Sequence, residues 1–186
     1  MAVQLSRHLF TVDDYYRMAE SGILREDDRV ELIDGEIIEM APIGSGHAGT
    51  VDEFGDIIRT LLDGVAIVRS QNPIRLGHRS EPEPDLALVT RRPDYYRGDH
   101  PRPADVLLLI EVAESSLEYD QQTKAPLYAR AGIPELWIVN LIDRVIEVYR
   151  EPSPEGYQSV RIMRRGETIQ PVSFPDLSIA VNDVLI

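Results

Sequence analysis

The segment that most constrains the fold is residues 105–113, which is almost continuously apolar and contains one carboxylate near its end, Glu111. A strand with one solvated face alternates between apolar and polar residues, whereas a strand covered on both faces is apolar throughout. The segment therefore predicts a central strand with layers packed on both of its faces. A buried carboxylate is rare unless it is paired or bound to a metal ion. We therefore favour a functional role for Glu111 over a structural salt bridge.

Turn signals and apolar spacing predict the elements that precede this strand. Residues 11–20 form a short helix with a capping-box start, and Asp34-Gly35 between alternating segments predicts a hairpin over residues 30–40. The spacing of apolar residues predicts a helix over residues 47–62. Strands are expected at residues 65–70, 73–76 and 85–89, followed by a polar, proline-rich loop over residues 90–104.

After the central strand, a helix is expected somewhere within residues 115–131, before Gly132. Its start stays open because Pro126 is tolerated in a first turn but kinks a helix interior. Strands follow at residues 135–140, 145–149 and 157–163, with short apolar pieces from there to Ile186. The sequence thus predicts a single α+β domain over residues 1–186, with a central mixed sheet of six or more strands flanked by helices.

Composition excludes several classes of protein. The chain has no cysteine, which excludes disulfides, thiolate zinc sites and cysteine nucleophiles. No apolar run approaches the roughly 18 residues of a membrane span, and the first residues lack the apolar core of a signal peptide. No phosphate-binding loop or serine nucleophile elbow is found. We expect a cytoplasmic enzyme or binding module that does not contact a membrane.

The net charge of −13 argues against a protein that binds nucleic acid nonspecifically, because such binding depends on displacing counterions with Lys and Arg. It does not exclude a nuclease, whose carboxylates add negative charge and whose metal ions restore attraction locally. Basic residues do gather on both sides of Asp85, but acids are interleaved among them. A basic patch and a mixed solvated loop both remain open. The basic residues are Arg75, His78, Arg79, Arg91, Arg92, Arg97, His100 and Arg102.

Lys124 is the only lysine of the chain, against eighteen arginines. Arginine cannot replace lysine where a compact point charge is needed. Taken alone, Lys124 fits an ordinary solvated helix face, or an ion pair with Asp120 four residues earlier. Together with Asp85 and Glu111 it completes the set that a metal-dependent phosphodiester hydrolase needs. Two carboxylates would bind a hard divalent cation, and the ammonium would orient or polarise the attacking water.

Further residues are candidates for the same site. The main-chain carbonyl of Val112 could supply another oxygen to a hard cation. Glu31 is either a further ligand or a solvent-facing residue of the hairpin. His47, at an expected helix start, either contacts a phosphate or water or is an exposed histidine near the helix cap. Gln71 is either a polar site residue or a surface position on a strand.

Several motifs in one order resemble the Uma family of restriction endonucleases, a branch of the PD-(D/E)xK nuclease superfamily. These motifs are residues 31–36, the loop that contains His47, residues 71–76, 83–86 and 110–112, Lys124, and residues 128–137. The resemblance extends from about residue 11 to residue 149. It implies a restriction-endonuclease-like fold, dependence on Mg²⁺ and a DNA substrate. The superfamily pattern would put lysine two positions after Glu111, where this chain has Ala113, so Lys124 must take over that role.

The leading hypothesis is a Mg²⁺-dependent DNA endonuclease, with Mn²⁺ as a possible substitute. Asp85, Glu111 and the Val112 carbonyl would bind the metal, and Lys124 would act on the water. Glu31 and His47 would assist. Cutting both strands implies a two-fold homodimer. The alternative is a non-catalytic nuclease-fold module for binding, in a defence or mobile-element system.

Overall fold

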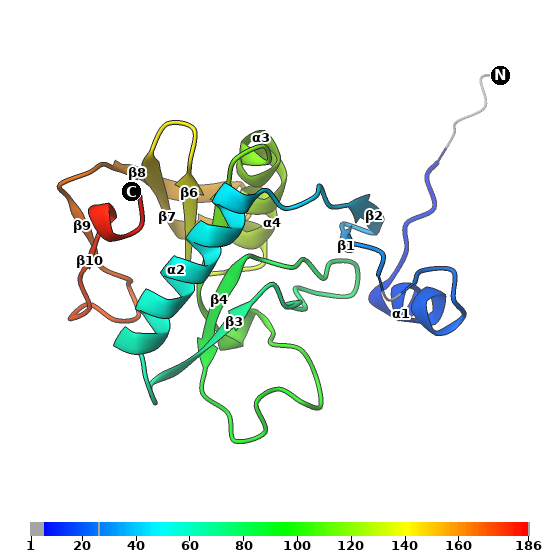
Figure 1. Cartoon of the computed structure of the whole chain (residues 1–186). Helices are drawn as coiled ribbons and strands as arrows, with labels where there is room; N and C mark the ends of the chain where they lie inside the picture. The colour runs from blue at the N-terminus through cyan, green and yellow to red at the C-terminus, as the bar shows by residue number, and fades with distance from the viewer. Residues whose placement is uncertain (1–5, 26, 186) are drawn as a thin grey trace.

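The computed structural model describes residues 6–25 and 27–185 and is built around a six-stranded mixed sheet (Figure 1). The strands are β3 (Ala66–Ser70), β4 (Leu86–Thr90), β5 (Val106–Ala113), β6 (Glu135–Asn140), β7 (Val145–Ser153) and β8 (Gly156–Met163). They are ordered β3-β4-β5-β6-β7-β8. Strands β5 and β6 are parallel, and every other neighbouring pair is antiparallel. The predicted mixed sheet is confirmed.

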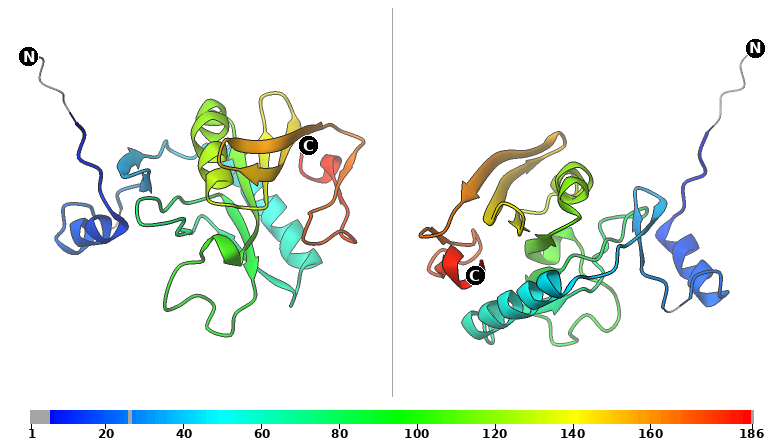
Figure 2. Two further views of the ribbon diagram at one scale, coloured as in Figure 1. Left: turned by 180° about the vertical axis from the view of Figure 1, so that it is seen from behind. Right: turned by 45° about the horizontal axis from the view of Figure 1, so that its top comes forward.

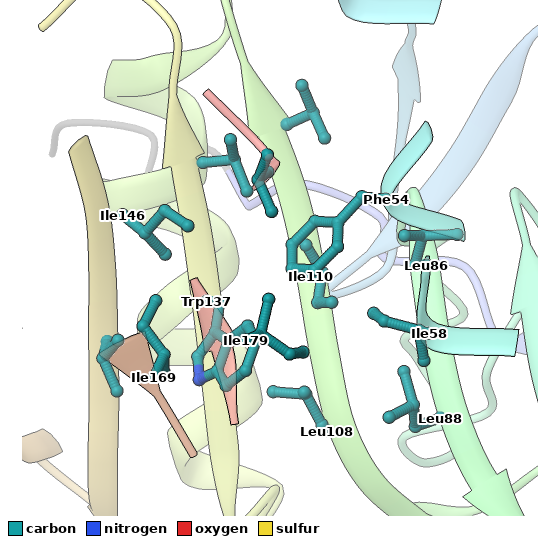
Figure 3. Close-up of a cluster of buried hydrophobic side chains, with 14 of the residues drawn as sticks. Phe54, Ile58, Leu86, Leu88, Leu108, Ile110, Trp137, Ile146, Ile169 and Ile179 are labelled. Carbon is teal, nitrogen blue, oxygen red and sulfur yellow. The ribbon is translucent and has the colours of Figure 1, made fainter. Parts of the chain in front are cut away.

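Both faces of the sheet are covered, which explains the apolar run of β5. Helix α2 (Ser45–Leu61) and the C-terminal segment pack on one face, around Trp137 (Figure 3). Helix α4 (Ala125–Arg130) packs on the other face through Tyr128. Consecutive residues of β5 point to opposite faces, so Leu108 enters the first cluster and Leu109 the second. Each residue of the run therefore has an apolar layer to pack against.

Smaller elements surround the sheet. Helix α1 (Val12–Glu20) precedes a separate hairpin of β1 (Val30–Ile33) and β2 (Glu36–Glu39), and this N-terminal unit projects to one side (Figure 2). The hairpin turns at Asp34-Gly35, as predicted, with positive φ at both residues. Near the C-terminus, β9 (Thr168–Ile169) pairs with β10 (Ile179–Ala180). Short 3₁₀ turns cover Pro103–Asp105 and Val181–Asp183.

The strand expected at residues 73–76 is wrong. Pro73 has no N–H to donate to a ladder. The N–H groups that follow go to carbonyls of separate segments: Ile74 donates to Pro82, and Arg75 donates to Pro101. Because no single partner strand accepts these hydrogen bonds, the segment is an irregular loop that packs beside the sheet.

The helix expected within residues 115–131 is present but interrupted. It consists of α3 (Leu117–Tyr119), a π-helical turn (Asp120–Lys124) and α4. Within the π turn, the N–H of Ala125 donates to the carbonyl of Asp120, five residues back. Pro126 is the physical reason, because it cannot donate an α-helical hydrogen bond to residue 122. The widened turn is also where the only lysine lies.

Other boundaries differ by a few residues. Helix α2 begins at Ser45, two residues before the expected start, and β7 continues to Ser153. The predicted apolar end at Ile186 lies outside the described residues. Over residues 6–25 and 27–185, no helix combines the length and the apolar character that crossing a membrane requires.

The fold predicts which aromatic contact is most costly to remove. Phe54 is fully buried on α2 and its ring stacks on Trp137 with centroids 6.0 Å apart. Phe54→Ala should lower the free energy of unfolding by about 3–5 kcal/mol, because it leaves a cavity between α2 and the sheet. Leu61 on the same helix is 45% exposed, so Leu61→Ala should change the free energy of unfolding by no more than about 0.5 kcal/mol. Urea unfolding followed by circular dichroism measures both, and equal midpoints would contradict this packing.

Candidate active site

A pocket of about 330 Å³ opens where the start of β4 and the end of β5 meet the N-terminus of α2 and the β1–β2 hairpin. All five predicted catalytic side chains line it, namely Glu31, His47, Asp85, Glu111 and Lys124. They come from five separate elements or their edges. The fold therefore brings together residues that are far apart in the sequence.

Lys124 is buried between two carboxylates. Its Nζ lies 3.2 Å from Oε1 of Glu111 and 3.5 Å from Oε2 of Glu31, and its side chain is 7% exposed. Burial alone would lower the pKa of Lys124, but the charges of Glu111 and Glu31 outweigh burial and raise it. The ammonium therefore keeps its proton at neutral pH. It provides a fixed positive charge rather than a proton for transfer.

Glu111 is enclosed at the end of β5. The hydroxyl of Tyr128 donates to its Oε1 at 2.6 Å, and the N–H of Asp85 is 3.4 Å from its Oε2. Burial raises the pKa of Glu111 well above its usual range; the charge of Lys124 lowers it, whereas Asp120 and Asp85 raise it further. Glu111 thus lies in a dry environment with an excess of negative charge.

Asp85 is the ionised carboxylate at the start of β4. Its Oδ2 accepts a hydrogen bond from the Val112 N–H at 2.8 Å, and its Oδ1 is hydrogen-bonded to Nε2 of His47 at 2.9 Å. Burial alone would raise the pKa of Asp85, but these bonds and the charge of His47 lower it. The same contact with Asp85 raises the pKa of His47, and a hydrogen bond to the Val112 backbone contributes. Gln71 also reaches Oδ1 of Asp85, at 3.4 Å.

The exposed alternatives for Glu31 and His47 are excluded, whereas their roles in catalysis stay predictions. Glu31 is 1% exposed, and it accepts hydrogen bonds from the Tyr119 hydroxyl at 3.0 Å and the Glu83 N–H at 3.1 Å. The solvent-facing alternative for Glu31 is wrong, because residues 81–83 pack against the hairpin. His47 is not an exposed cap residue, since its side chain is 16% exposed and bonded to Asp85.

Sequence reasoning missed two residues of the pocket region. Asp120 is 3% exposed, lines the pocket and accepts a hydrogen bond from the Ser116 hydroxyl at 2.7 Å. The suggested ion pair is wrong, since Asp120 and Lys124, both among the described residues, do not approach to ion-pair distance. Tyr128, whose hydroxyl donates to Glu111, was not among the candidate site residues. The spacing of four residues from Asp120 to Lys124 to Tyr128 was the available signal, because it puts them on one helix face.

Comparison with known proteins identifies the family. Residues 12–182 match the Uma2 family, described as "Putative restriction endonuclease". The chain belongs to the Uma2 family. The crystal structure of "a putative nuclease belonging to DUF820" from Anabaena variabilis ATCC 29413 is similar, with a TM-score of 0.72 and 18% identity over 94% of this chain and 97% of that chain. No curated protein matches the chain significantly.

The structural likeness confirms the predicted restriction-endonuclease-like fold. Membership of the Uma2 family supports a nuclease, and therefore a nucleic-acid substrate. This family description agrees with a pocket in which carboxylates and one ammonium converge at strand ends. The kind of metal ion that would fit this pocket follows from its donor groups.

The donor groups of this Uma2 protein fit a hydrated hard cation. Among residues 6–25 and 27–185, no three Asp, Glu or His side chains are arranged to hold a metal ion alone. Mg²⁺ does not need such a cage, since it is commonly held by one or two carboxylates, waters and substrate phosphates. The lining has an excess of negative charge that a divalent cation would relieve. It contains the carboxylates Glu31, Glu39, Glu83, Asp85, Glu111, Glu114 and Asp120 against the basic residues Arg29, His47 and Lys124.

The charge excess predicts a stability effect at Asp120. Burial raises the pKa of Asp120 from 3.8 to about 6, so the folded protein loses stability as the pH rises from about 4 through about 6. Asp120→Asn keeps an acceptor for Ser116 but has no charge to bury. Without divalent cations, it should raise the free energy of unfolding near neutral pH by on the order of 2 kcal/mol.

Thermal unfolding in EDTA at several pH values measures this effect. The difference between Asp120→Asn and the wild type should vanish at a pH about one unit below 3.8, where Asp120 is protonated in both the folded and unfolded states. Glu118→Gln is the matched control, because Glu118 is exposed and carries the same charge two residues away. If the two variants show the same change in stability with pH, the negative charge of Asp120 does not destabilise the folded protein.

Proposed function

We propose that this protein is a Mg²⁺-dependent endonuclease that hydrolyses phosphodiester bonds of DNA in this pocket. The observation that carries the proposal is the burial of the only lysine, Lys124, 3.2 Å from Glu111 and in one pocket with Asp85. These are the residue types that metal-dependent phosphodiester hydrolysis requires. They come together from strands and a helix, although Asp85 and Lys124 are 39 positions apart in the sequence.

The residues proposed to hold Mg²⁺ are Asp85, Glu111 and the carbonyl of Val112, and Mn²⁺ could replace it. Such a cation would supply Lewis-acid polarisation of the scissile phosphate and a more acidic bound water. Two features support these ligands. Asp85 is held ionised by its partners. Asp120 and Asp85 add negative charge near Glu111, which already shares Lys124 with Glu31, and this excess of negative charge favours the binding of a cation.

Lys124 is proposed to orient the attacking water and to stabilise charge that develops on the phosphate. Because the surrounding carboxylates raise its pKa, it acts as a fixed ammonium. Glu31 assists by holding the ammonium together with Glu111, and Tyr128 fixes Glu111. His47, in the first turn of α2, is proposed to contact a phosphate of the substrate, where the helix dipole favours an anion.

The alternative is a non-catalytic nuclease-fold module that binds a partner. The net charge of −13 favours it, because the chain as a whole repels DNA. Calorimetric titration with Mg²⁺ or Mn²⁺ discriminates, since a binding module has no need of a divalent-cation site. The homodimer is part of the endonuclease proposal, because a nuclease that cuts both strands of a duplex commonly uses two active centres related by a two-fold axis.

Glu111→Gln tests the proposed metal site. Cleavage of plasmid DNA in the presence of Mg²⁺ should be abolished, because one of the two carboxylate ligands is lost. Without metal, the melting temperature should stay the same or rise, since repulsion among the carboxylates is relieved. The stabilisation on adding Mg²⁺ should shrink. Glu114→Gln is the control, because Glu114 lines the same pocket, is exposed and has no proposed role.

Two results would contradict the assignment of Glu111. If Glu111→Gln melts far below the wild type in EDTA, Glu111 is the structural ion-pair partner of Lys124 and not a ligand. If Glu111→Gln cleaves as fast as Glu114→Gln, the pocket is not the place of cleavage.

Lys124→Arg tests the requirement for a compact ammonium. The variant keeps the charge but should lose most cleavage, since a guanidinium fork is too large for the space between Glu31 and Glu111. Mg²⁺ affinity should change little, because lysine is not a ligand. Plasmid cleavage and calorimetry are compared for the wild type, Lys124→Arg and Lys124→Ala, with circular dichroism to check the fold. Full cleavage by Lys124→Arg but not by Lys124→Ala would mean that only positive charge matters.

A further inference from the structure

The loop of residues 91–102 joins β4 to β5 and extends beyond the end of the sheet (Figure 1). Both aspartates of this loop form ion pairs with arginines. Asp94 accepts two hydrogen bonds from Arg92, at 3.1 and 2.8 Å. Asp99 pairs with Arg102 at 2.8 Å and lies 3.5 Å from Arg75. The interleaved acids therefore neutralise only some of the basic residues of this loop.

Arg91 and Arg97 are the remaining arginines of the 91–102 loop, and both are exposed. Within residues 6–25 and 27–185, neither has a carboxylate at ion-pair distance. Both guanidinium groups lie by the ring of Tyr95 instead, 5.7 and 5.9 Å from its centroid. An aromatic ring attracts a guanidinium without neutralising it, so most of its N–H donors stay available. Tyr95 itself is 48% exposed.

The backbone of the loop is held in a strained form that presents Tyr95 outward. Tyr95 and Tyr96 have φ values of 51° and 58°, which bulky residues rarely adopt. Such a conformation persists only where the surroundings fix it. Tyr96 provides the anchor, since it is 5% exposed, donates to the Thr90 carbonyl at 2.8 Å and has the Arg92 guanidinium 4.6 Å from its ring centroid.

We propose that Arg91, Tyr95 and Arg97 form a second contact site, which binds the phosphodiester backbone of nucleic acid away from the active site. Arg91 donates one hydrogen bond to the Tyr95 hydroxyl, at 3.1 Å, and neither arginine has a carboxylate partner among the described residues. Two such guanidinium forks on a rigid support match the geometry of phosphate oxygens. The identity of the ligand rests on the proposed nuclease function. In a chain with a net charge of −13, attraction to DNA has to come from such local groups.

The distance between the 91–102 loop and Asp85 can be compared with the spacing of base pairs in DNA. Strand β4 separates Asp85 from Arg91 by six residues, which corresponds to roughly 20 Å at about 3.3 Å per residue. That distance spans about six base pairs of B-DNA at 3.4 Å each. A duplex that runs parallel to β4 would therefore meet the 91–102 loop on one flank of the bond that is cut, and not at the bond itself.

Binding of a fluorescent DNA duplex in EDTA, followed by anisotropy over a range of salt concentrations, tests this site independently of cleavage. The double variant Arg91→Ala/Arg97→Ala should bind several-fold more weakly, and the slope of log affinity against log salt should fall by about 2. Tyr95→Ala should weaken binding as well, whereas Tyr95→Phe, which keeps the ring, should retain most of it. Arg164→Ala/Arg165→Ala is the matched control, because it removes two exposed arginines after β8, the opposite edge strand of the sheet.

Each other outcome overturns the inference in a distinguishable way. If the wild type binds and cleaves DNA but the two double variants behave alike, the loop site is wrong and the proposed function stands. If the wild type neither binds nor cleaves DNA, the proposed function fails and the loop inference fails with it. If poly-glutamate displaces DNA as well as unlabelled DNA does at equal charge, the loop binds polyanions in general, and the inference that it recognises the phosphodiester backbone is wrong.

Discussion

The buried contact of Lys124 with Glu31 and Glu111 is the interaction on which the rest of the pocket depends. Three chain segments meet there: the β1–β2 hairpin through Glu31, the end of β5 through Glu111, and the π turn through Lys124. Ionised groups are costly to remove from water, and the positive charge of Lys124 offsets part of that cost for both glutamates. The hairpin is outside the main sheet, and this network, together with the hydrogen bonds of residues 79–83, joins its strand β1 to the centre of the fold. The pocket exists because the hairpin is fixed there.

The irregular helix that carries Lys124 follows from one residue. Pro126 cannot donate the hydrogen bond that would continue an α-helix, and the turn before it widens to the π form. The side chains of Asp120 and Lys124 both enter the pocket from this turn, while Tyr128 reaches Glu111 from the following helix. The proline that interrupts the α-helix therefore lies where the chain supplies the pocket with Asp120 and Lys124, and supplies Glu111 with the Tyr128 hydroxyl. Such π turns are frequent at functional sites.

Much of the fold could be predicted because strong local signals agreed with the tertiary structure. The run of β5, the Asp34-Gly35 turn and the helical spacing of α2 each specify their element without knowledge of its neighbours. The failures share a different cause. Whether residues 73–76 join a ladder depends on which carbonyls lie opposite, and the burial of Glu31 depends on residues 81–83. Periodicity carries no information about such long-range partners, which is why the strand prediction for residues 73–76 is wrong and why the alternatives for Glu31 stayed open.

Another buried carboxylate shows by contrast what distinguishes the pocket. Glu135 is fully buried on β6, and its two oxygens accept hydrogen bonds from Trp137, Arg150 and the N–H of Val172, all at 2.7–2.8 Å. One arginine fork and two neutral donors match one carboxylate, so nothing about Glu135 calls for a ligand. In the pocket, Glu111 shares a single ammonium with Glu31 and has Asp120 and Asp85 near it. The sequence alone could not show that Glu111 and Glu135 have different roles, since each adjoins apolar residues of a central strand. The difference lies in the balance of charge around each carboxylate, because Arg150 pairs with Glu135 whereas Lys124 is shared between two glutamates. That balance supports a structural role for Glu135 and a cation-binding role for Glu111.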